Sequence, residues 1–201
     1  MIPLVVIVAG MVSLALEMAA ARLLAPFFGT SLYTWAILIG LILLYLTAGY
    51  WLGGKLADRR PYRAPFFALT GVAAATVALV GAIATPILSA ALKGTERLPF
   101  GLFFGTIAGC LILFTIPTIL LGSVSPYAIR LSTGSVNGSG NAAGTVFALT
   151  TIGSLAGTFS AVFLFIPSIG TRATLYVFAG LLLAASALAF AINQPTIEVG
   201  S

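Results

Sequence analysis

The chain has 201 residues, of which 60% are hydrophobic and only 6% are charged. Soluble domains carry roughly 25% charged residues, so the composition excludes an ordinary soluble domain and indicates an integral membrane protein. The net charge of +5 does not indicate nucleic-acid binding, because the basic residues flank apolar stretches and form no patch with interleaved aromatics. Histidine is absent and the single cysteine, Cys110, lies in an apolar stretch. This excludes histidine-based metal sites, histidine proton shuttles and a disulfide framework, and we expect no metal, cofactor or catalytic residues.

Six apolar stretches are long enough to cross a membrane, which takes about 20 mostly apolar residues in a helix. They cover residues 3–25, 32–54, 64–91, 99–121, 141–166 and 172–192. The strands of a membrane barrel are about ten residues long and alternate between apolar and polar residues. These stretches are about twice as long and do not alternate, which excludes a barrel. The sequence therefore predicts an all-α, polytopic domain over residues 1–193 in contact with the lipid bilayer, followed by a short polar tail over residues 194–201. The N-terminus has no basic region, so we expect the first stretch to be retained as a helix.

The orientation depends on the loop at residues 53–63, which holds four of the nine basic residues. Positive loops beside short apolar spans stay on the cytoplasmic side, so both termini are expected in the cytoplasm, in the cell (inner) membrane. The cytoplasmic side would then hold Lys55, Arg59, Arg60, Arg63 and Arg130. The outer side would hold Arg22, Lys93, Arg97 and Arg172, partly offset by Glu96.

Glu17 is a carboxylate inside the first predicted helix, about 21 Å along it at 1.5 Å per residue. Gly10, Ser13 and Glu17 share one helical face, which suits a bundle interior better than lipid. An ionisable group at this depth is a candidate for binding a cation, a substrate or a proton. The alternative is a carboxylate neutralised by hydrogen bonds or by a basic residue elsewhere in the bundle.

The fifth predicted helix carries Thr150, Ser154 and Thr158 on one face, where they could line a polar cavity together with Glu17 and Ser13. The alternative is a packing face whose hydroxyls bond to their own backbone. Small-residue ridges for close helix packing are formed by Gly101, Gly105 and Gly109 in the fourth helix and by Gly153 and Gly157 in the fifth. The ridge in the fourth helix could pack within the chain or against a second copy. Pro126 is expected to interrupt the end of the fourth helix.

The loop Gly54-Lys55-Leu56-Ala57-Asp58-Arg59 resembles the cytoplasmic motif between the second and third helices of the major facilitator superfamily. The resemblance ends after Arg59, where Pro61 replaces a glycine and Arg63 falls one place late. It implies that Asp58, Arg59 and Arg63 form a latch between helices at the cytoplasmic side.

A broader resemblance covers the segment from Glu17 through Arg22, the loop described above and two later segments. These are Leu121-Gly122-Ser123 with Pro126 and Arg130, and Phe147-Ala148-Leu149-Thr150-Thr151-Ile152-Gly153. Together they are similar to the membrane half of fused transporter and spermidine-synthase-like proteins. The resemblance implies polyamines or similar organic cations as substrates. We expect no synthase-like soluble domain in this chain and therefore no catalysis of that kind.

An internal repeat relates the third and sixth helices, since Arg63-Ala64 matches Arg172-Ala173 and Gly71 matches Gly180 at the same offset. The first and fourth helices show no clear match. The repeat predicts two inverted three-helix units, resembling half of a major facilitator transporter. The leading hypothesis is a half-size transporter that works as a homodimer and moves a small organic cation, coupled or not to protons. The alternative is a structural subunit that anchors a separately encoded soluble synthase-like partner. An enzyme is not expected, because no nucleophile–base set or paired carboxylates are present.

Overall fold

A computed structural model describes residues 1–133 and 138–192, and these residues form helices joined by short connections. In chain order the helices are α1 (Ile2–Phe28), α2 (Leu32–Arg59), α3 (Arg63–Thr95), α4 (Gly101–Ser132), α5 (Ser139–Phe159), η2 (Ser160–Phe165), α6 (Ile166–Ile169) and α7 (Thr171–Ile192). Taking Ser139–Ile169 as one continuous helical rod, six helices are long and apolar enough to cross a membrane. The all-α, six-helix prediction is confirmed. The predicted tail, residues 194–201, lies outside the described residues. Most of the helices end several residues later than predicted.

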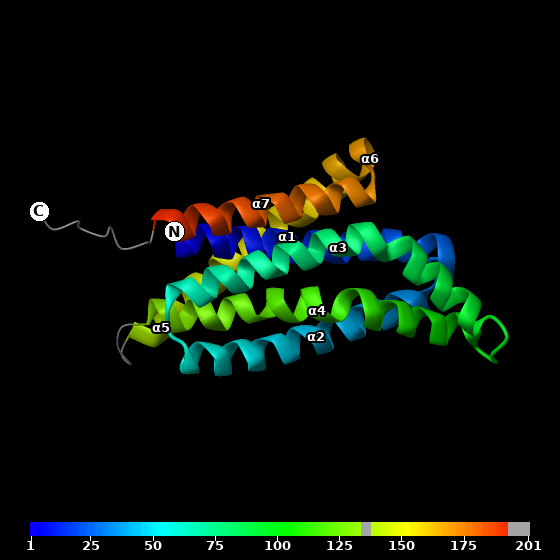
Figure 1. The fold of residues 1–201 in the computed structure, drawn as a ribbon, viewed down its shortest axis with the longest axis horizontal. Coiled ribbons are helices and arrows are strands. Elements are labelled where there is room, and N and C mark those ends of the chain that lie inside the picture. Colours follow the sequence, from blue (N-terminus) through cyan, green and yellow to red (C-terminus); the bar gives the residue numbers. More distant parts are fainter. Residues whose placement is uncertain (134–137, 193–201) are drawn as a thin grey trace, which may run out of the picture.

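The helices run alternately up and down, so the N-terminus, the α2–α3 connection and the end of α7 lie at one end of the bundle (Figure 1). We call this the basic end, because it holds Lys55, Arg59, Arg60, Arg63 and Arg130. The opposite end holds the α1–α2, α3–α4 and α6–α7 connections. Its basic residues are Arg22, Lys93, Arg97 and Arg172.

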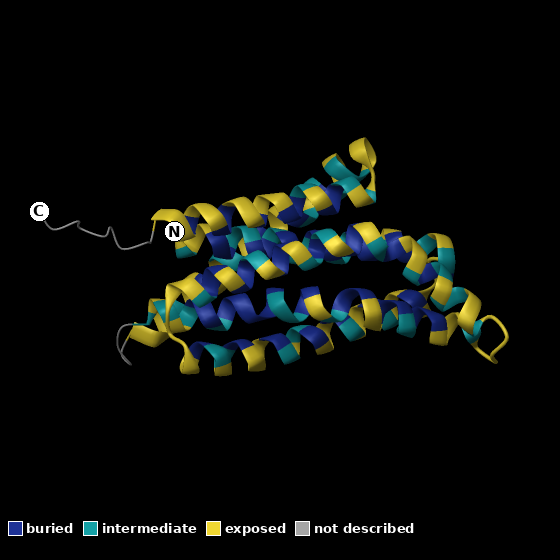
Figure 2. Cartoon of the chain, in the orientation of Figure 1, coloured by how far each residue is buried: buried dark blue, intermediate teal, exposed yellow. Residues whose placement is uncertain are grey.

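Helices α1, α3 and α4 form the centre of the bundle. About half of the apolar window of each is buried, 50% for α1, 50% for α3 and 56% for α4, against 28% for α2 and 17% for Ser139–Ile169. Helix α1 packs mainly against α5 and α7, helix α4 packs against α2 and α3, and α3 contacts α7. Buried residues follow α4 along most of its length, whereas α2 turns an exposed face outward (Figure 2). Helices α2 and α5 therefore flank the centre and present the largest free faces.

Glycines allow the closest helix approaches in the bundle. At the α2–α4 crossing, a Cβ on Gly53 would lie 2.6 Å from the Cα of Ser123. At the α1–α5 crossing, a Cβ on Gly157 would lie 2.6 Å from the Cα of Met11. Gly49 and Gly122 complete the first crossing, and Gly10 and Gly153 complete the second. These contacts require the absence of a side chain, because real Cβ atoms do not approach so closely.

The glycine ridge of α4 packs inside the chain. A Cβ on Gly105 would lie 2.7 Å from the ring of Phe28, and one on Gly109 would lie 2.7 Å from Leu88. Gly101 meets the backbone of Thr95. Of the two alternatives for this ridge, the structure places it in contacts between α4, α3 and the end of α1.

Helix α4 continues through Pro126 to Ser132, so the prediction that Pro126 would interrupt it is wrong. A proline inside a helix costs ~3 kcal/mol. The residues around it are well packed: Tyr127 is fully buried and its ring lies 5.5 Å from that of Phe66. Tertiary packing therefore outweighs the local preference.

The helix around Pro167 is wound differently. The π-helix η2 ends at Phe165, two residues before Pro167, and the Ile166 N–H donates to the Ala161 carbonyl, five residues back.

Candidate functional site

A small polar cavity of about 90 Å³ lies where α1 and α5 meet α2 and α4. Hydroxyl groups from all four helices line it: Ser13, Tyr50, Ser125, Thr150 and Ser154. The remaining lining is apolar or glycine and includes Gly10 and Gly122. We call this space the middle cavity.

The hydroxyls of the middle cavity are only partly used by the protein. Ser125 and Thr150 are joined by a 3.3 Å hydrogen bond, and the Thr150 hydroxyl also donates to the Val146 carbonyl over 2.9 Å. Ser154 donates to the Gly10 carbonyl over 3.2 Å, which ties α5 to α1. Within residues 1–133 and 138–192, the hydroxyls of Ser13 and Tyr50 have no hydrogen-bond partner. The cavity therefore keeps free donors and acceptors for water or for a small ligand.

Glu17 lies one helical turn beyond Ser13 on the same face of α1 and is partly buried. Tyr50 of α2 lines the middle cavity together with Ser13. None of the described residues forms a hydrogen bond or an ion pair with the Glu17 carboxylate. The structure thus does not show the neutralised carboxylate that was the alternative to a functional role.

Two larger hollows lie toward the ends of the bundle on either side of the middle cavity. The basic-end vestibule, about 400 Å³, lies between the start of α1, the end of α4 and the start of α5. Its lining includes Val6, Ser132, Asn141 and Thr145. The opposite-end groove, about 490 Å³, lies between α1, α2 and the η2–α6 segment, with Arg22, Trp35 and Ile166 in its lining.

Three of the five predicted substrate or proton-binding residues line the middle cavity: Ser13, Thr150 and Ser154. Glu17 lies next to it, between the residues of α1 that line the middle cavity and those that line the opposite-end groove. The Thr158 hydroxyl donates to the Ser154 carbonyl over 2.9 Å, and Thr158 lines neither space. Sequence reasoning missed Tyr50 and Ser125, which come from helices where no polar face was recognised.

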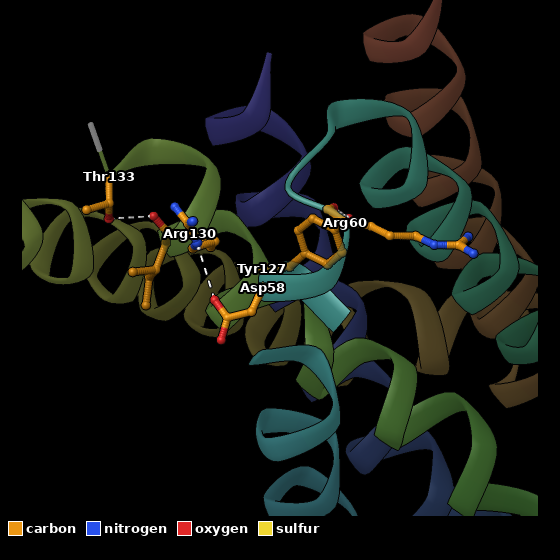
Figure 3. A network of polar contacts seen from close by, with 6 residues as sticks. Asp58, Arg60, Tyr127, Arg130 and Thr133 are labelled. Atoms are coloured by element: carbon orange, nitrogen blue, oxygen red, sulfur yellow. Dashed lines mark hydrogen bonds and ion pairs between the residues drawn. The ribbon is translucent and has the colours of Figure 1, made fainter. Parts of the chain in front are cut away.

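At the predicted latch, an ion pair joins two helices. Asp58 of α2 pairs with Arg130 of α4, with 3.3 Å between Nε and the carboxylate oxygen (Figure 3). Tyr127 of α4 adds a second link, since its hydroxyl donates to the Arg60 carbonyl just past the end of α2. Arg59 lies beside Asp58 in sequence, but the ion pair that joins two helices uses Arg130. The basic end of α2 is therefore fastened to α4.

Searches against protein-family models, curated proteins and solved structures found no match to this chain.

Proposed function

We propose that the chain is a half-size membrane transporter that works as a homodimer and moves a small organic cation such as a polyamine. It would be built from two inverted repeats, α1–α3 and α4–α7, with both termini in the cytoplasm. The basic end would then face the cytoplasm.

The glycine crossings support the repeat. At the α2–α4 crossing, Gly49 meets Ile119, Gly53 meets Ser123 and Gly122 meets Leu46. At the α1–α5 crossing, Gly153 meets Ile7, Gly157 meets Met11 and Gly10 meets Thr150. Adding 104 to the residue numbers of Leu46, Gly49 and Gly53 in α2 gives Thr150, Gly153 and Gly157 in α5. Adding 112 to those of Ile7, Gly10 and Met11 in α1 gives Ile119, Gly122 and Ser123 in α4. One contact pattern is thus used twice, by helices that run in opposite directions.

The middle cavity is lined by pairs of positions that these two shifts exchange. They are Ala9 with Leu121, Gly10 with Gly122, Ser13 with Ser125, Leu46 with Thr150, and Tyr50 with Ser154. Ser13 lies about 16 Å from the start of α1, near the middle of a hydrocarbon core of ~30 Å. Transporters with inverted repeats bind substrate near the membrane midplane, at the interface between the repeats.

Glu17 carries the proposal, because it is a carboxylate without a protein partner among the described residues, beside a polar cavity at this depth. An unpaired carboxylate in a membrane is costly and is usually kept for function. A cavity of about 90 Å³ is smaller than the roughly 300 Å³ or more of ordinary ligand sites, so passage of a polyamine requires rearrangement. The free faces of α2 and α5 would provide the surface on which a second copy rocks.

Uptake of radiolabelled spermidine into liposomes that contain the purified protein tests the proposal. Glu17→Gln should abolish uptake while leaving thermal stability unchanged, because no residue within 1–133 and 138–192 bonds to the Glu17 carboxylate. Glu96→Gln is the matched control, since Glu96 is exposed in the α3–α4 connection. Undiminished uptake by the Glu17→Gln protein would remove the site from consideration. A particle mass of one chain in detergent and in lipid nanodiscs would contradict the homodimer.

A further inference from the structure

The three hollows follow one another along a single seam, where α1 lies against the Ser139–Ile169 rod. On α1, the lining passes from Ile2, Pro3 and Val6 in the basic-end vestibule to Val6, Ala9, Gly10, Ser13 and Leu14 in the middle cavity, and to Met18, Ala21, Arg22 and Ala25 in the opposite-end groove. On the facing rod, it passes from Thr145, Val146 and Leu149 to Thr150 and Ser154, and then to Val162, Ile166 and Pro167. Val6 belongs to both the vestibule and the middle cavity. Glu17 itself lines none of the three, and it lies on α1 between Leu14 of the middle cavity and Met18 of the opposite-end groove.

The middle cavity is large and polar enough for water. A volume of about 90 Å³ has room for roughly three molecules at ~30 Å³ each. A buried water needs two to four polar partners, and five hydroxyls line this space. Its walls are too close for a polyamine in this arrangement of the helices, but not for a chain of waters.

We propose that this seam is a proton pathway through a single protomer, in which Glu17 is the protonatable group between the opposite-end groove and the middle cavity. The proposal rests on the proposed transport function and deepens it by naming the proton as a second cation that the protein carries. It differs from the substrate route, which needs the second copy.

The proton steps balance without any further reactant. A hydronium ion in the opposite-end groove gives one proton to the Glu17 carboxylate, which leaves a water and a neutral carboxyl group. The carboxyl group then gives the proton to a water of the middle cavity, near Ser13 and Tyr50, and regains its charge. Waters held by Ser125 and Thr150 pass the proton toward Val6 and the basic-end vestibule.

Few other ionisable groups can compete with Glu17 along the seam. Helix α5, η2 and α6 carry no ionisable side chain. Of the ionisable groups of α2, which are Tyr33, Tyr45, Tyr50, Lys55, Asp58 and Arg59, Tyr50 lines the middle cavity. The other helices packed on α1 carry only Arg63, Lys93, Cys110, Tyr127, Arg130, Arg172 and Tyr176. Cys110 and Tyr127 are fully buried on α4, and Arg172 donates to Thr85 of α3. Arg22, on α1 itself, lines the groove, and its guanidinium stays charged throughout the physiological pH range.

Proton flux is measured with a pH-sensitive dye inside liposomes, after an acid step outside, with valinomycin and potassium to hold the membrane potential. Wild type should acidify the interior faster than protein-free liposomes, and Glu17→Gln should lower that excess rate by ~100-fold, the scale of losing a proton-transfer group. Thr150→Val should lower it by ~10-fold, as expected for the loss of one hydrogen bond from the relay. Thr151→Val is the matched control, because Thr151 is exposed and its hydroxyl bonds only to the Phe147 carbonyl of its own helix. It should conduct like wild type.

A wild-type flux equal to that of protein-free liposomes would overturn the proton pathway, and so would equal rates for Thr150→Val and Thr151→Val. Spermidine exchange at equal pH on both sides is measured on the same liposomes and separates the two proposals. Exchange without proton flux would leave the transporter standing and remove the pathway. Proton flux without exchange would retain the pathway and remove the polyamine as substrate.

Discussion

The α2–α4 and α1–α5 crossings use the same glycine contacts but differ in what surrounds them. At the first, Leu46 lies against Gly122, with a Cβ on that glycine only 3.1 Å from the Leu46 carbonyl oxygen, and Ser123 donates to the Gly49 carbonyl over 3.0 Å. At the second, the position of Leu46 is taken by Thr150, which faces the middle cavity, and Glu17 lies nearby. Backbone contact therefore sets the geometry of both crossings, and the second carries the Thr150 hydroxyl where the first carries the apolar Leu46. Variants that separate packing from chemistry test this comparison.

The largest effect is expected where a side chain is added at either crossing. Gly53→Leu and Gly157→Leu would drive a side chain into the backbone of the facing helix, at a cost of about 3 kcal/mol or more. Thermal unfolding in detergent should show both variants losing most of their folded population at temperatures where wild type is intact. Gly54→Leu and Gly144→Leu are the controls, because nothing lies within 4 Å of a Cβ at either position. A folded Gly53→Leu protein with wild-type stability would show that the crossing is not as close as described.

A smaller effect is expected where one interhelical hydrogen bond is removed. Ser123→Ala and Ser154→Ala each delete a hydroxyl that donates across a crossing, to Gly49 and Gly10 respectively. Each should cost about 0.6–1.7 kcal/mol of stability, the range of such bonds in membranes. Only Ser154→Ala should also slow spermidine uptake, because Ser154 lines the middle cavity and Ser123 does not. Equal uptake by the two variants would erase the functional difference between the crossings.

The smallest effect is expected at the ion pair of the basic end. The Asp58 and Arg130 side chains are 74% and 48% exposed, so solvent screens their attraction. A double-mutant cycle with Asp58→Asn and Arg130→Gln should give a coupling of about 0.5 kcal/mol in thermal unfolding, decreasing as salt is added. A coupling that is large and independent of salt would mean that the pair is shielded from water, for example by the second copy.

The sequence predicted the six helices because their length and apolar content are local properties, which do not depend on how the helices pack. It also selected Ser13, Thr150 and Ser154, since their spacing places them on single helical faces. It missed Ser125 and Tyr50, because their partners lie on other helices and only the fold brings them together. Pro126 was misjudged for the same reason, as the packing of Tyr127 is not visible in the local pattern.

The likeness of the first and fourth helices was also missed, although it is present in the sequence. Ile7, Gly10, Val12 and Ser13 match Ile119, Gly122, Val124 and Ser125 at an offset of 112 residues. The third and sixth helices match at 109 and the second and fifth at 104, so no single offset aligns all three pairs. The contacts between helices show which offset belongs to the first and second pairs.

The π-helix η2 has a consequence for any attempt to straighten the Ser139–Ile169 rod. An α-helix advances about 100° per residue, so Thr150 and Ile166 would point about 160° apart in an uninterrupted one. A π turn accommodates roughly one extra residue and reduces that angle by ~100°, which allows both residues to line the same seam. Forcing Ser160–Phe165 into regular α-helix without removing a residue would rotate Ile166 and Pro167 by ~100°, out of the groove, whereas deleting one residue there would restore regular α-helix and keep them in place. The wide turn thus works as a phase correction, keeping both halves of one helix aimed at α1.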